Sequence, residues 1–501
     1  MKKRLIIIIC LIGVFAGLVA LAVCTGKPPE PSETEGCTSY DIVANLDIEN
    51  GILTASQRVL FVNNTKTAIS ELVFNLYPNA YREDAAIKPV TETHRPDAYY
   101  AGESFGSIEI AAVKDQSSAL NFEIGGVDKN LLCVDLSAPV ENGGKTVVEM
   151  EYAVKLPKTH TRFGITKTGV SLCNFYPILC VHENGGWYEA PYYPVGDPFY
   201  SETAVYTVDL TVPRGGTLAA TGQLVESLSQ NGRTTYRYAA EKVRDFAMVY
   251  LPEGKTISER VNGKDVNYFY TSDENPDFSL KAAADSLAVY EEAYGAYPYP
   301  VFNVVDTDFI YGGMEYPNLI IINNALDGFN REYTIAHETA HQWWYGMVGN
   351  NSIEEAWQDE GLTEFSTALY FKHTGREPLY NAVMASAYDT YVYAAARLNG
   401  LKLPFDGVMR RALNLFSSET AYIITAYDKG MLMFQSLYNM TGEKNFLKAC
   451  RNYLNNNKYK NATPEDLMTC FPEHKKLIEN WLNGKVILGA APPYTEEARA
   501  A

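Results

Sequence analysis

Two histidines and a glutamate lie within one short segment, residues 337–346, whose sequence is HETAHQWWYG. If this segment is helical, His337 and His341 lie on one face with Cβ atoms roughly 5–6 Å apart, so both imidazoles can bind one ion. Glu338 then lies beside them and can reach a water on that ion. The pattern H-E-x-x-H is typical of zinc peptidases. The alternative is a helix whose histidines are hydrogen-bonded inside a core.

A third ligand is available on the next predicted helix. The first helix is expected at about 330–346, ending by Gly346 or at the turn GNN, residues 349–351. Ser352 with Glu355 fits a capping box that predicts a new helix start. Glu360 follows His341 by nineteen residues, and a helix–turn–helix can return its carboxylate to the histidine pair. Two histidines and one glutamate form a zinc set that leaves one position for water.

Glu364 lies one helical turn beyond Glu360 and can orient a ligand histidine through a hydrogen bond. The alternative is an ordinary solvated carboxylate. The chain has no C-x-x-C pattern, so a cysteine zinc site is not expected. The other five histidines have no partner pattern and are expected to be structural or surface residues: His94, His160, His182, His373 and His474.

Four segments, in a fixed order, resemble the aminopeptidase N family of gluzincin zinc peptidases, whose members include the leukotriene hydrolases. Two of them carry the zinc pattern, HETAHQWWYG and WQDEGLTEF. The segment GGMEYP, residues 312–317, resembles the family's G-x-M-E-N motif, and AYDKG, residues 426–430, resembles its Y-x-K-G motif. The segments FNLYPNAY and VRDFAMV look like the family's N-terminal domain. The resemblance covers about residues 40–485.

The resemblance implies peptide-bond hydrolysis with one Zn²⁺ as cofactor and a peptide as substrate. Glu338 is then the general base, and the Tyr427 hydroxyl stabilises the oxyanion. Tyr422 has no such support and is expected to pack. The substrate-binding segment implied by the resemblance consists of Gly312, Gly313, Met314 and Glu315.

Within that segment, Glu315 would pair with the α-ammonium group of the substrate, because a buried ammonium needs a partner. The alternative is an exposed acid at the end of a strand. Gly312 and Gly313 fit a backbone that approaches the substrate closely, and Met314 is expected to pack.

The sequence departs from the family pattern in three places. Tyr316 replaces the asparagine of G-x-M-E-N, Tyr345 precedes Gly346 where the family has the glycine one place earlier, and the chain ends soon after the catalytic region. We therefore expect a short bacterial, membrane-anchored form without the helical C-terminal domain. An endopeptidase or specialised hydrolase on the same zinc is an alternative. A non-catalytic peptide-binding protein would have a broken catalytic position, and none is broken.

The elements that must position these residues fall into two classes. Short, Val-, Thr- and Tyr-rich runs with Gly and Asn turns predict strands up to about residue 270, and helical periodicity dominates beyond about 330. We expect a multidomain chain with an all-β, sandwich-like N-terminal domain and an α+β, thermolysin-like zinc peptidase domain. The predicted divisions are a leader at 1–24, a linker at 25–37, the β-rich domain at 38–270, the catalytic domain at 271–490 and a tail at 491–501.

The N-terminus predicts membrane attachment. Lys2, Lys3 and Arg4 precede an uncharged run from Leu5 to Val23, which is about long enough to span a bilayer. Cys24 follows Leu-Ala-Val, which resembles a bacterial lipoprotein signal. A lipid on Cys24 and an uncleaved transmembrane anchor are both open, and both place the rest of the chain outside the cytoplasm.

Charge and cysteine content narrow the function further. The formal net charge is −18, which argues against nucleic acid as a partner, because phosphate binding needs a basic surface. Outside the leader there are six cysteines, and a location outside the cytoplasm permits disulfides. Cys173 with Cys180 and Cys450 with Cys470 are the candidates nearest in sequence, although spacing does not determine connectivity.

Overall fold

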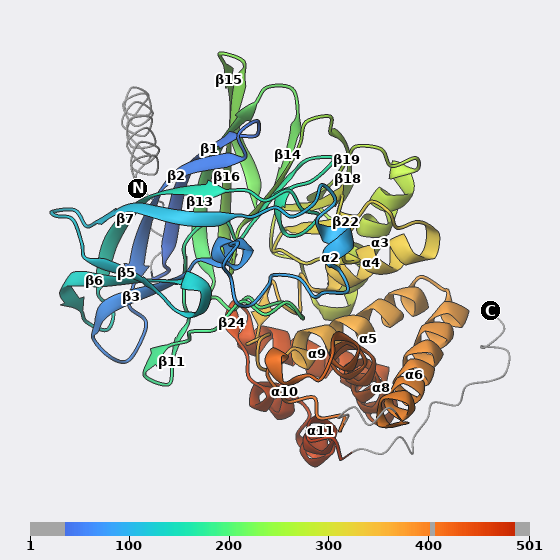
Figure 1. Ribbon diagram of the computed structural model, residues 1–501. Helices are drawn as coiled ribbons and strands as arrows, with labels where there is room; N and C mark the ends of the chain where they lie inside the picture. The colour runs from blue at the N-terminus through green and yellow to red at the C-terminus, as the bar shows by residue number, and fades with distance from the viewer. Residues whose placement is uncertain (1–35, 401–405, 486–501) are drawn as a thin grey trace. The chain divides into compact units, whose positions relative to one another are not determined.

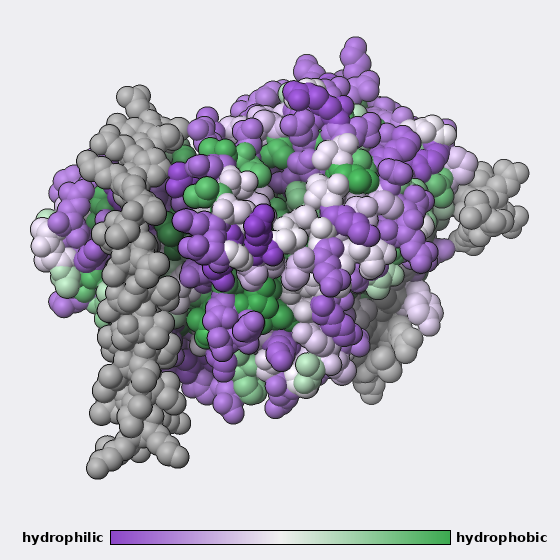
Figure 2. Space-filling view, turned by 90° about the horizontal axis from the view of Figure 1, so that it is seen from above, coloured by the Kyte–Doolittle hydropathy of each residue, from purple (hydrophilic) through white to green (hydrophobic). Residues whose placement is uncertain are grey.

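The computed structural model describes residues 36–400 and 406–485 (Figure 1). The predicted leader at 1–24 with Cys24, nearly all of the linker and the tail at 491–501 lie outside the described residues. No helix in the described part of the chain is long and apolar enough to cross a membrane. Hydrophilic residues cover most of the face seen from above, with smaller hydrophobic areas between them (Figure 2).

The first half of the chain is built from strands, drawn in blue to green in Figure 1. The largest sheet has alternating burial, so that Tyr40, Ile42 and Ala44 of its central strand face the core. Its order is β15 (Gln223–Gln230), β16 (Arg233–Val243), β13 (Ala204–Pro213), β1 (Ser39–Asp47), β2 (Ile52–Val62), β7 (Lys145–Lys155) and β4 (Ser107–Lys114).

Two four-stranded sheets and a hairpin complete this half. One sheet runs β10 (Ile178–Leu179), β3 (Ile69–Asn75), β6 (Leu131–Val140) and β5 (Phe122–Gly125). The other runs β14 (Thr217–Ala220), β17 (Ala247–Leu251), β9 (Val170–Cys173) and β8 (Phe163–Ile165). The hairpin joins β11 (His182–Glu183) to β12 (Gly186–Trp187), and the short helix α2 (Arg95–Ala98) lies in the excursion between β3 and β4.

A five-stranded sheet lies next to the helices. Its order is β18 (Lys255–Val261), β19 (Lys264–Tyr270), β20 (Val301–Thr307), β22 (Leu319–Asn323) and β21 (Gly313–Met314), which leaves β21 at an edge. Helix α3 (Pro276–Tyr294) connects β19 to β20, which are parallel neighbours. The first strand of this sheet, β18, begins at Lys255, so residues 255–270 lie in one sheet with the strands that precede the metal motif.

Helices follow this sheet and are drawn in yellow to red. Their bounds are α4 (Gly328–Ala340), α5 (Trp357–His373), α6 (Glu377–Gly400), α7 (Glu419–Ile423), a π-helical turn (Ile424–Lys429), α8 (Gly430–Thr441), α9 (Glu443–Asn457), α10 (Pro464–Cys470) and α11 (Lys475–Leu482). The short strands β23 (Val348–Gly349) and β24 (Lys460–Asn461) pair in parallel. A β-rich half followed by an α+β half confirms the predicted fold class.

The helix predicted up to residue 346 ends instead at Ala340, with His341 as its C-cap residue. Beyond it the backbone tightens, because Gly346 N–H donates to the carbonyl of His341 at 2.8 Å. Tyr345 then has φ of +151°, a conformation that favours glycine. Arg244 of the β-rich half fixes this turn by donating from Nε to the Tyr345 carbonyl at 2.6 Å.

The capping box predicted at Ser352 is wrong. The helix begins at Trp357, and Ser352 Oγ donates to Asp359 Oδ2 at 2.9 Å rather than accepting a backbone N–H. The carbonyl of Asn351 accepts the N–H of Glu355 at 2.8 Å, which satisfies the local turn before the helix starts.

The two candidate disulfides are also not formed. All six cysteines in the described residues are free thiols. Cys173 ends β9, and Cys180 follows β10, which belongs to a different sheet, so closeness in sequence does not become a bond. Cys450 and Cys470 lie on α9 and α10.

Candidate active site

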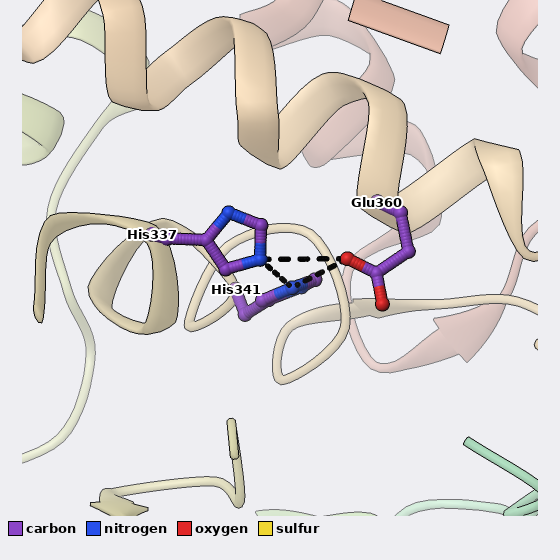
Figure 3. A group of neighbouring side chains, drawn as sticks. All are labelled: His337, His341 and Glu360. Carbon is purple, nitrogen blue, oxygen red and sulfur yellow. Dashed lines mark hydrogen bonds and ion pairs between the residues drawn. The ribbon is translucent and has the colours of Figure 1, made fainter. Parts of the chain in front are cut away.

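Three predicted metal ligands converge where α4 ends and α5 begins (Figure 3). The two Nε2 atoms of His337 and His341 are 3.1 Å apart, and Glu360 Oε2 lies 3.4 Å and 3.2 Å from them. A tetrahedral zinc with bonds of about 2.0–2.1 Å separates its ligand atoms by about 3.3–3.4 Å. The side chains therefore already have nearly the spacing that zinc imposes.

The hydrogen bonds around these atoms fit a cation between them. His341 Nδ1 lies 2.9 Å from the carbonyl of Trp344, so Nδ1 carries the proton and Nε2 presents a lone pair. Glu360 Oε2 is buried and has no hydrogen-bond partner. Burial raises the pKa of the Glu360 carboxyl, but His341 and His337 lower it by more. The net effect is a lowered pKa, so this carboxyl stays ionised. The residues present thus fit a zinc ion.

Glu338 directly follows His337 on α4 and lines the same cavity as the metal ligands. It is 5% exposed, and its Oε2 has no hydrogen-bond partner. Burial raises its pKa to about 7, against the opposing effect of His337 and His341. A dication nearby would lower this pKa, because it favours the charged carboxylate. Glu338 is placed where a general base is required.

Glu364 lies in the wall of the cavity rather than in solvent. Its Oε1 is 3.6 Å from His337 Nδ1, and its Oε2 accepts a short hydrogen bond from the Tyr333 hydroxyl. This places a carboxylate on the Nδ1 side of the His337 ring at ion-pair distance, but Nδ1 makes no hydrogen bond among the described residues, so the predicted orienting hydrogen bond is not formed.

Tyr427 reaches the site from the π-helical turn between α7 and α8. Its hydroxyl donates to Glu360 Oε1 at 2.6 Å, and its ring stacks on that of His337 with centroids 6.0 Å apart. A π-helical turn is rare and is common at functional sites. The backbones of Gly361 and Gly430 touch here, since a Cβ on either would lie 2.7 Å from the other's Cα. This contact brings α8 against α5 and the turn against the ligand.

The predicted substrate segment forms the edge strand β21 and the residues around it. Glu315 is buried at 4% exposure and has carboxylate oxygens within 4.8 Å of the ligand atoms of Glu338 and His341. Gly312 and Gly313 line the cavity with their backbone. Met314 packs in the core, where its sulfur accepts from Arg162 Nε at 3.0 Å.

Tyr316, the departure from the family pattern, is fully buried. Its hydroxyl donates to Asn174 Oδ1 of the β-rich half at 2.9 Å, and its carbonyl accepts from Gln342 Nε2 at 3.2 Å. Gln342 directly follows the ligand His341. Tyr316 therefore ties the end of the substrate segment to the first half through its hydroxyl and to the metal motif through its backbone carbonyl.

The cavity has a volume of about 230 Å³, and several of its lining residues were not predicted from the sequence, four of which carry charge or a buried hydroxyl. Arg162 and Asp197 come from the β-rich half and form a short ion pair. Glu419 and Tyr422 come from α7. Tyr422 was expected to pack; its ring is indeed buried, but it also forms part of the cavity wall. No motif marks these residues, and only the i, i+3 spacing of Glu419 and Tyr422 hinted at a shared helix face.

Comparisons with known proteins agree with this geometry. Residues 278–483 match the Peptidase family M1 domain. The chain is 26% identical over 211 residues to aminopeptidase 2, mitochondrial, of Saccharomyces cerevisiae, which covers 39% of this chain and 22% of that protein. It is 23% identical over 293 residues to leucyl aminopeptidase of Saccharolobus solfataricus, covering 54% and 36%. The chain thus spans about a fifth to a third of the length of these relatives.

Solved structures share the fold over most of the chain. The M1 zinc metallopeptidase of Deinococcus radiodurans superposes with a TM-score of 0.65 at 17% identity, covering 92% of this chain and 97% of that one. A mutant of it bound to a Tyr-Ser-Ala substrate gives a TM-score of 0.64 at 16% identity, covering 91% and 96%. The segment that matches the Peptidase family M1 domain contains His337, His341, Glu360 and Glu338, and these solved structures share the fold around it.

Proposed function

We propose that the protein is a zinc-dependent aminopeptidase that releases N-terminal residues from peptides. One observation carries this proposal: the buried carboxylate of Glu315 lies in the same cavity as the metal ligands, within 4.8 Å of Glu338 and His341 ligand atoms. A buried carboxylate beside the reacting group needs a cation, and the α-ammonium group of a peptide supplies one. The relatives named as aminopeptidases and the neighbour solved with Tyr-Ser-Ala support the same substrate class.

His337, His341 and Glu360 would hold the zinc, which when bound supplies Lewis-acid activation of a water and of the scissile carbonyl. Glu338 accepts the proton of the attacking water and passes it to the leaving amine. The Tyr427 hydroxyl donates to the oxyanion that develops on the carbonyl. For this it must leave Glu360 Oε1, to which it donates at 2.6 Å.

The test compares aminoacyl amides with a free and an N-acetylated α-amino group, using zinc-loaded protein. We expect turnover of the free amines alone, because acetylation removes the charge that Glu315 binds. Equal turnover of both forms would favour an endopeptidase or specialised hydrolase on the same zinc. Absence of turnover with every peptide, at full zinc occupancy, would leave the non-catalytic peptide-binding alternative.

We also propose that the protein acts outside the cytoplasm, attached to the membrane by its N-terminus. The support is sequence alone: Lys2, Lys3 and Arg4 before the uncharged run Leu5–Val23, and Cys24 after it. Fatty-acid labelling of the native chain and of a Cys24→Ser variant separates the two attachments. Label lost in the variant indicates a lipid anchor, an unlabelled but membrane-bound chain indicates a transmembrane anchor, and a fully released chain contradicts both.

A further inference from the structure

One wall of the cavity contains Tyr311, Glu419 and Tyr422, none of which is a metal ligand. Tyr311 directly precedes Gly312, so it continues the segment that carries Glu315. Glu419 and Tyr422 are three residues apart on α7, which places them on one face of the helix. None of these three residues has a task in the proposed hydrolysis.

The Tyr422 hydroxyl is a buried polar group without a hydrogen-bond partner in the described residues, so its oxygen is free to accept a hydrogen bond. Tyr422 is 4% exposed, and its oxygen makes no hydrogen bond. The loop of the β-rich half closes over it, because a Cβ on Gly196 would lie 3.0 Å from this oxygen. The neighbouring phenol of Tyr427 donates to Glu360 instead. A buried hydroxyl left unpaired is costly, and one that faces a cavity is available to a ligand.

Glu419 is held at this wall by an excursion of the β-rich half. Its Oε1 lies 3.0 Å from His94 Nε2, and its Oε2 accepts from Thr91 Oγ1 at 3.2 Å. The His94 ring also contacts Tyr311 edge-on, with centroids 5.4 Å apart. Each carboxylate oxygen has one of these partners and can accept a further hydrogen bond. Glu419 is therefore fixed in place with acceptor capacity to spare.

The one basic side chain that pairs with Glu419 among the described residues is the imidazole of His94. Six carboxylates line the cavity: Asp197, Glu315, Glu338, Glu360, Glu364 and Glu419. Arg162, the one guanidinium among the described lining residues, pairs with Asp197. Glu360 serves the metal, Glu338 the proton transfer and Glu315 the α-ammonium group. Among the described residues, Glu419 pairs with no lysine or arginine.

We propose that the wall of Tyr311, Glu419 and Tyr422 binds the side chain of the substrate's N-terminal residue and selects a cationic one, lysine or arginine. This inference rests on the proposed aminopeptidase function. Glu419 binds the ammonium or guanidinium group, the Tyr422 oxygen accepts from it, and the Tyr311 and Tyr422 rings cover the alkyl stem. The enzyme would then act on peptides with a basic first residue.

The test uses substrate pairs of equal shape and different charge, namely arginine against citrulline amide and lysine against norleucine amide. We expect kcat/KM to favour the charged member by about tenfold or more, the range of a hydrogen bond to a charged group. Glu419→Gln keeps the shape and should bring both ratios close to one. Glu109 is an exposed residue of β4 and is not part of the cavity lining, so Glu109→Gln is the matched control and should keep both ratios.

Binding of free L-arginine and L-citrulline, measured by calorimetry on the zinc-loaded protein and on Glu419→Gln, checks the same selection without turnover. Hydrolysis of leucine amide with charged-to-neutral ratios near one in the native protein overturns the selection but not the aminopeptidase function. If the charged-to-neutral ratios of kcat/KM are unchanged in Glu419→Gln, then Glu419 does not take part in the selection. If no free aminoacyl amide is hydrolysed, the proposed function fails, and equal binding of the two amino acids then overturns the selection as well.

Discussion

Gly313 and Glu338 are in direct contact: a Cβ on Gly313 would lie 2.4 Å from Oε1 and 2.6 Å from Cγ of Glu338. The neighbouring Gly312 has more room, since its Cβ would meet only Thr334 atoms at 3.6 and 3.7 Å. The absence of a side chain at Gly313 therefore leaves the space that Glu338 occupies. The absence of a side chain at Gly312 has no such role, because a Cβ there would not meet Glu338.

Gly313→Ala should displace the Glu338 carboxylate and lower turnover by about a hundredfold or more, because general-base catalysis contributes 10²–10⁴-fold. Zinc content should not change, since the ligands are untouched. Steady-state kinetics with metal analysis measures both. Gly312→Ala is the matched comparison, because its Cβ would meet Thr334 and not Glu338, and it should lose less turnover than Gly313→Ala; equal losses in the two variants would contradict the contact.

Glu338→Gln should keep the zinc and lose turnover by roughly 10²–10⁴-fold, because the amide has nearly the same shape but cannot accept the proton. The variant should still bind a substrate or a product amino acid. Metal analysis, calorimetry and kinetics on one preparation check these three points. Wild-type turnover in this variant would sink the assigned role.

Tyr427→Phe should lower kcat by roughly 10²–10³-fold with unchanged zinc content, the loss seen when one oxyanion donor is removed. Tyr422→Phe is its matched partner, because Tyr422 lies on the adjoining helix α7 and the centroids of the two rings are 5.7 Å apart. We expect Tyr422→Phe to change kcat/KM chiefly for basic N-terminal residues. An unaffected kcat in Tyr427→Phe would remove this hydroxyl from the chemistry.

Metal removal should lower the melting temperature, because zinc binds the folded state and stabilises it by about 4 kcal/mol when its free concentration is a thousand times Kd. Calorimetry with and without a chelator measures the shift. Glu360→Ala should melt at the same temperature in both conditions. A persistent zinc-dependent shift in that variant would place the ion elsewhere.

Asp245→Asn should change the pH dependence of stability. Asp245 is buried, and burial raises its pKa to about 6 from 3.8, while its Oδ2 accepts from the Tyr345 hydroxyl at 2.6 Å. The folded state then binds more protons than the unfolded state between these values, so this contribution is present at low pH and lost as pH rises through 6.

The native protein should accordingly lose about 2 kcal/mol of unfolding free energy relative to Asp245→Asn between pH 4 and pH 7, at 1.36 kcal/mol per pH unit. Urea unfolding of both proteins across this range provides the measurement. A difference in unfolding free energy that is flat with pH would mean that Asp245 stays ionised throughout.

The sequence predicted the parts of the site that depend on local spacing. His337 and His341 lie one turn apart, and Glu360 returns on the next helix, because these relations follow from helix geometry alone. The helix ends were less predictable. His341 is a C-cap residue, and Ser352 bonds Asp359, because contacts with Arg244 and with the first turn of α5 prevail over local capping preferences.

The rest of the cavity depends on contacts between distant segments. Asp197 and Arg162 arrive from the β-rich half, and His94, which has no motif, reaches Glu419 from 325 residues away. No spacing rule relates such residues, so their place emerges only when the sheets and helices are assembled. The same holds for Tyr316, whose hydroxyl finds Asn174 across the two halves.

The number of residues in the π-helical turn at Ile424–Lys429 bears on the proposed selection of the substrate side chain, as do the side chains themselves. An α-helix turns by about 100° per residue, so the additional residue of this turn fixes the angle between Glu419 and Tyr422 on one side and Tyr427 on the other. Deleting one residue between Tyr422 and Tyr427 would make α7 and α8 one continuous α-helix. Glu419 and Tyr422 would then be rotated away from the Tyr427 hydroxyl. A one-residue insertion or deletion in this turn would therefore alter the proposed selection of the substrate side chain while leaving His337, His341 and Glu360 unchanged.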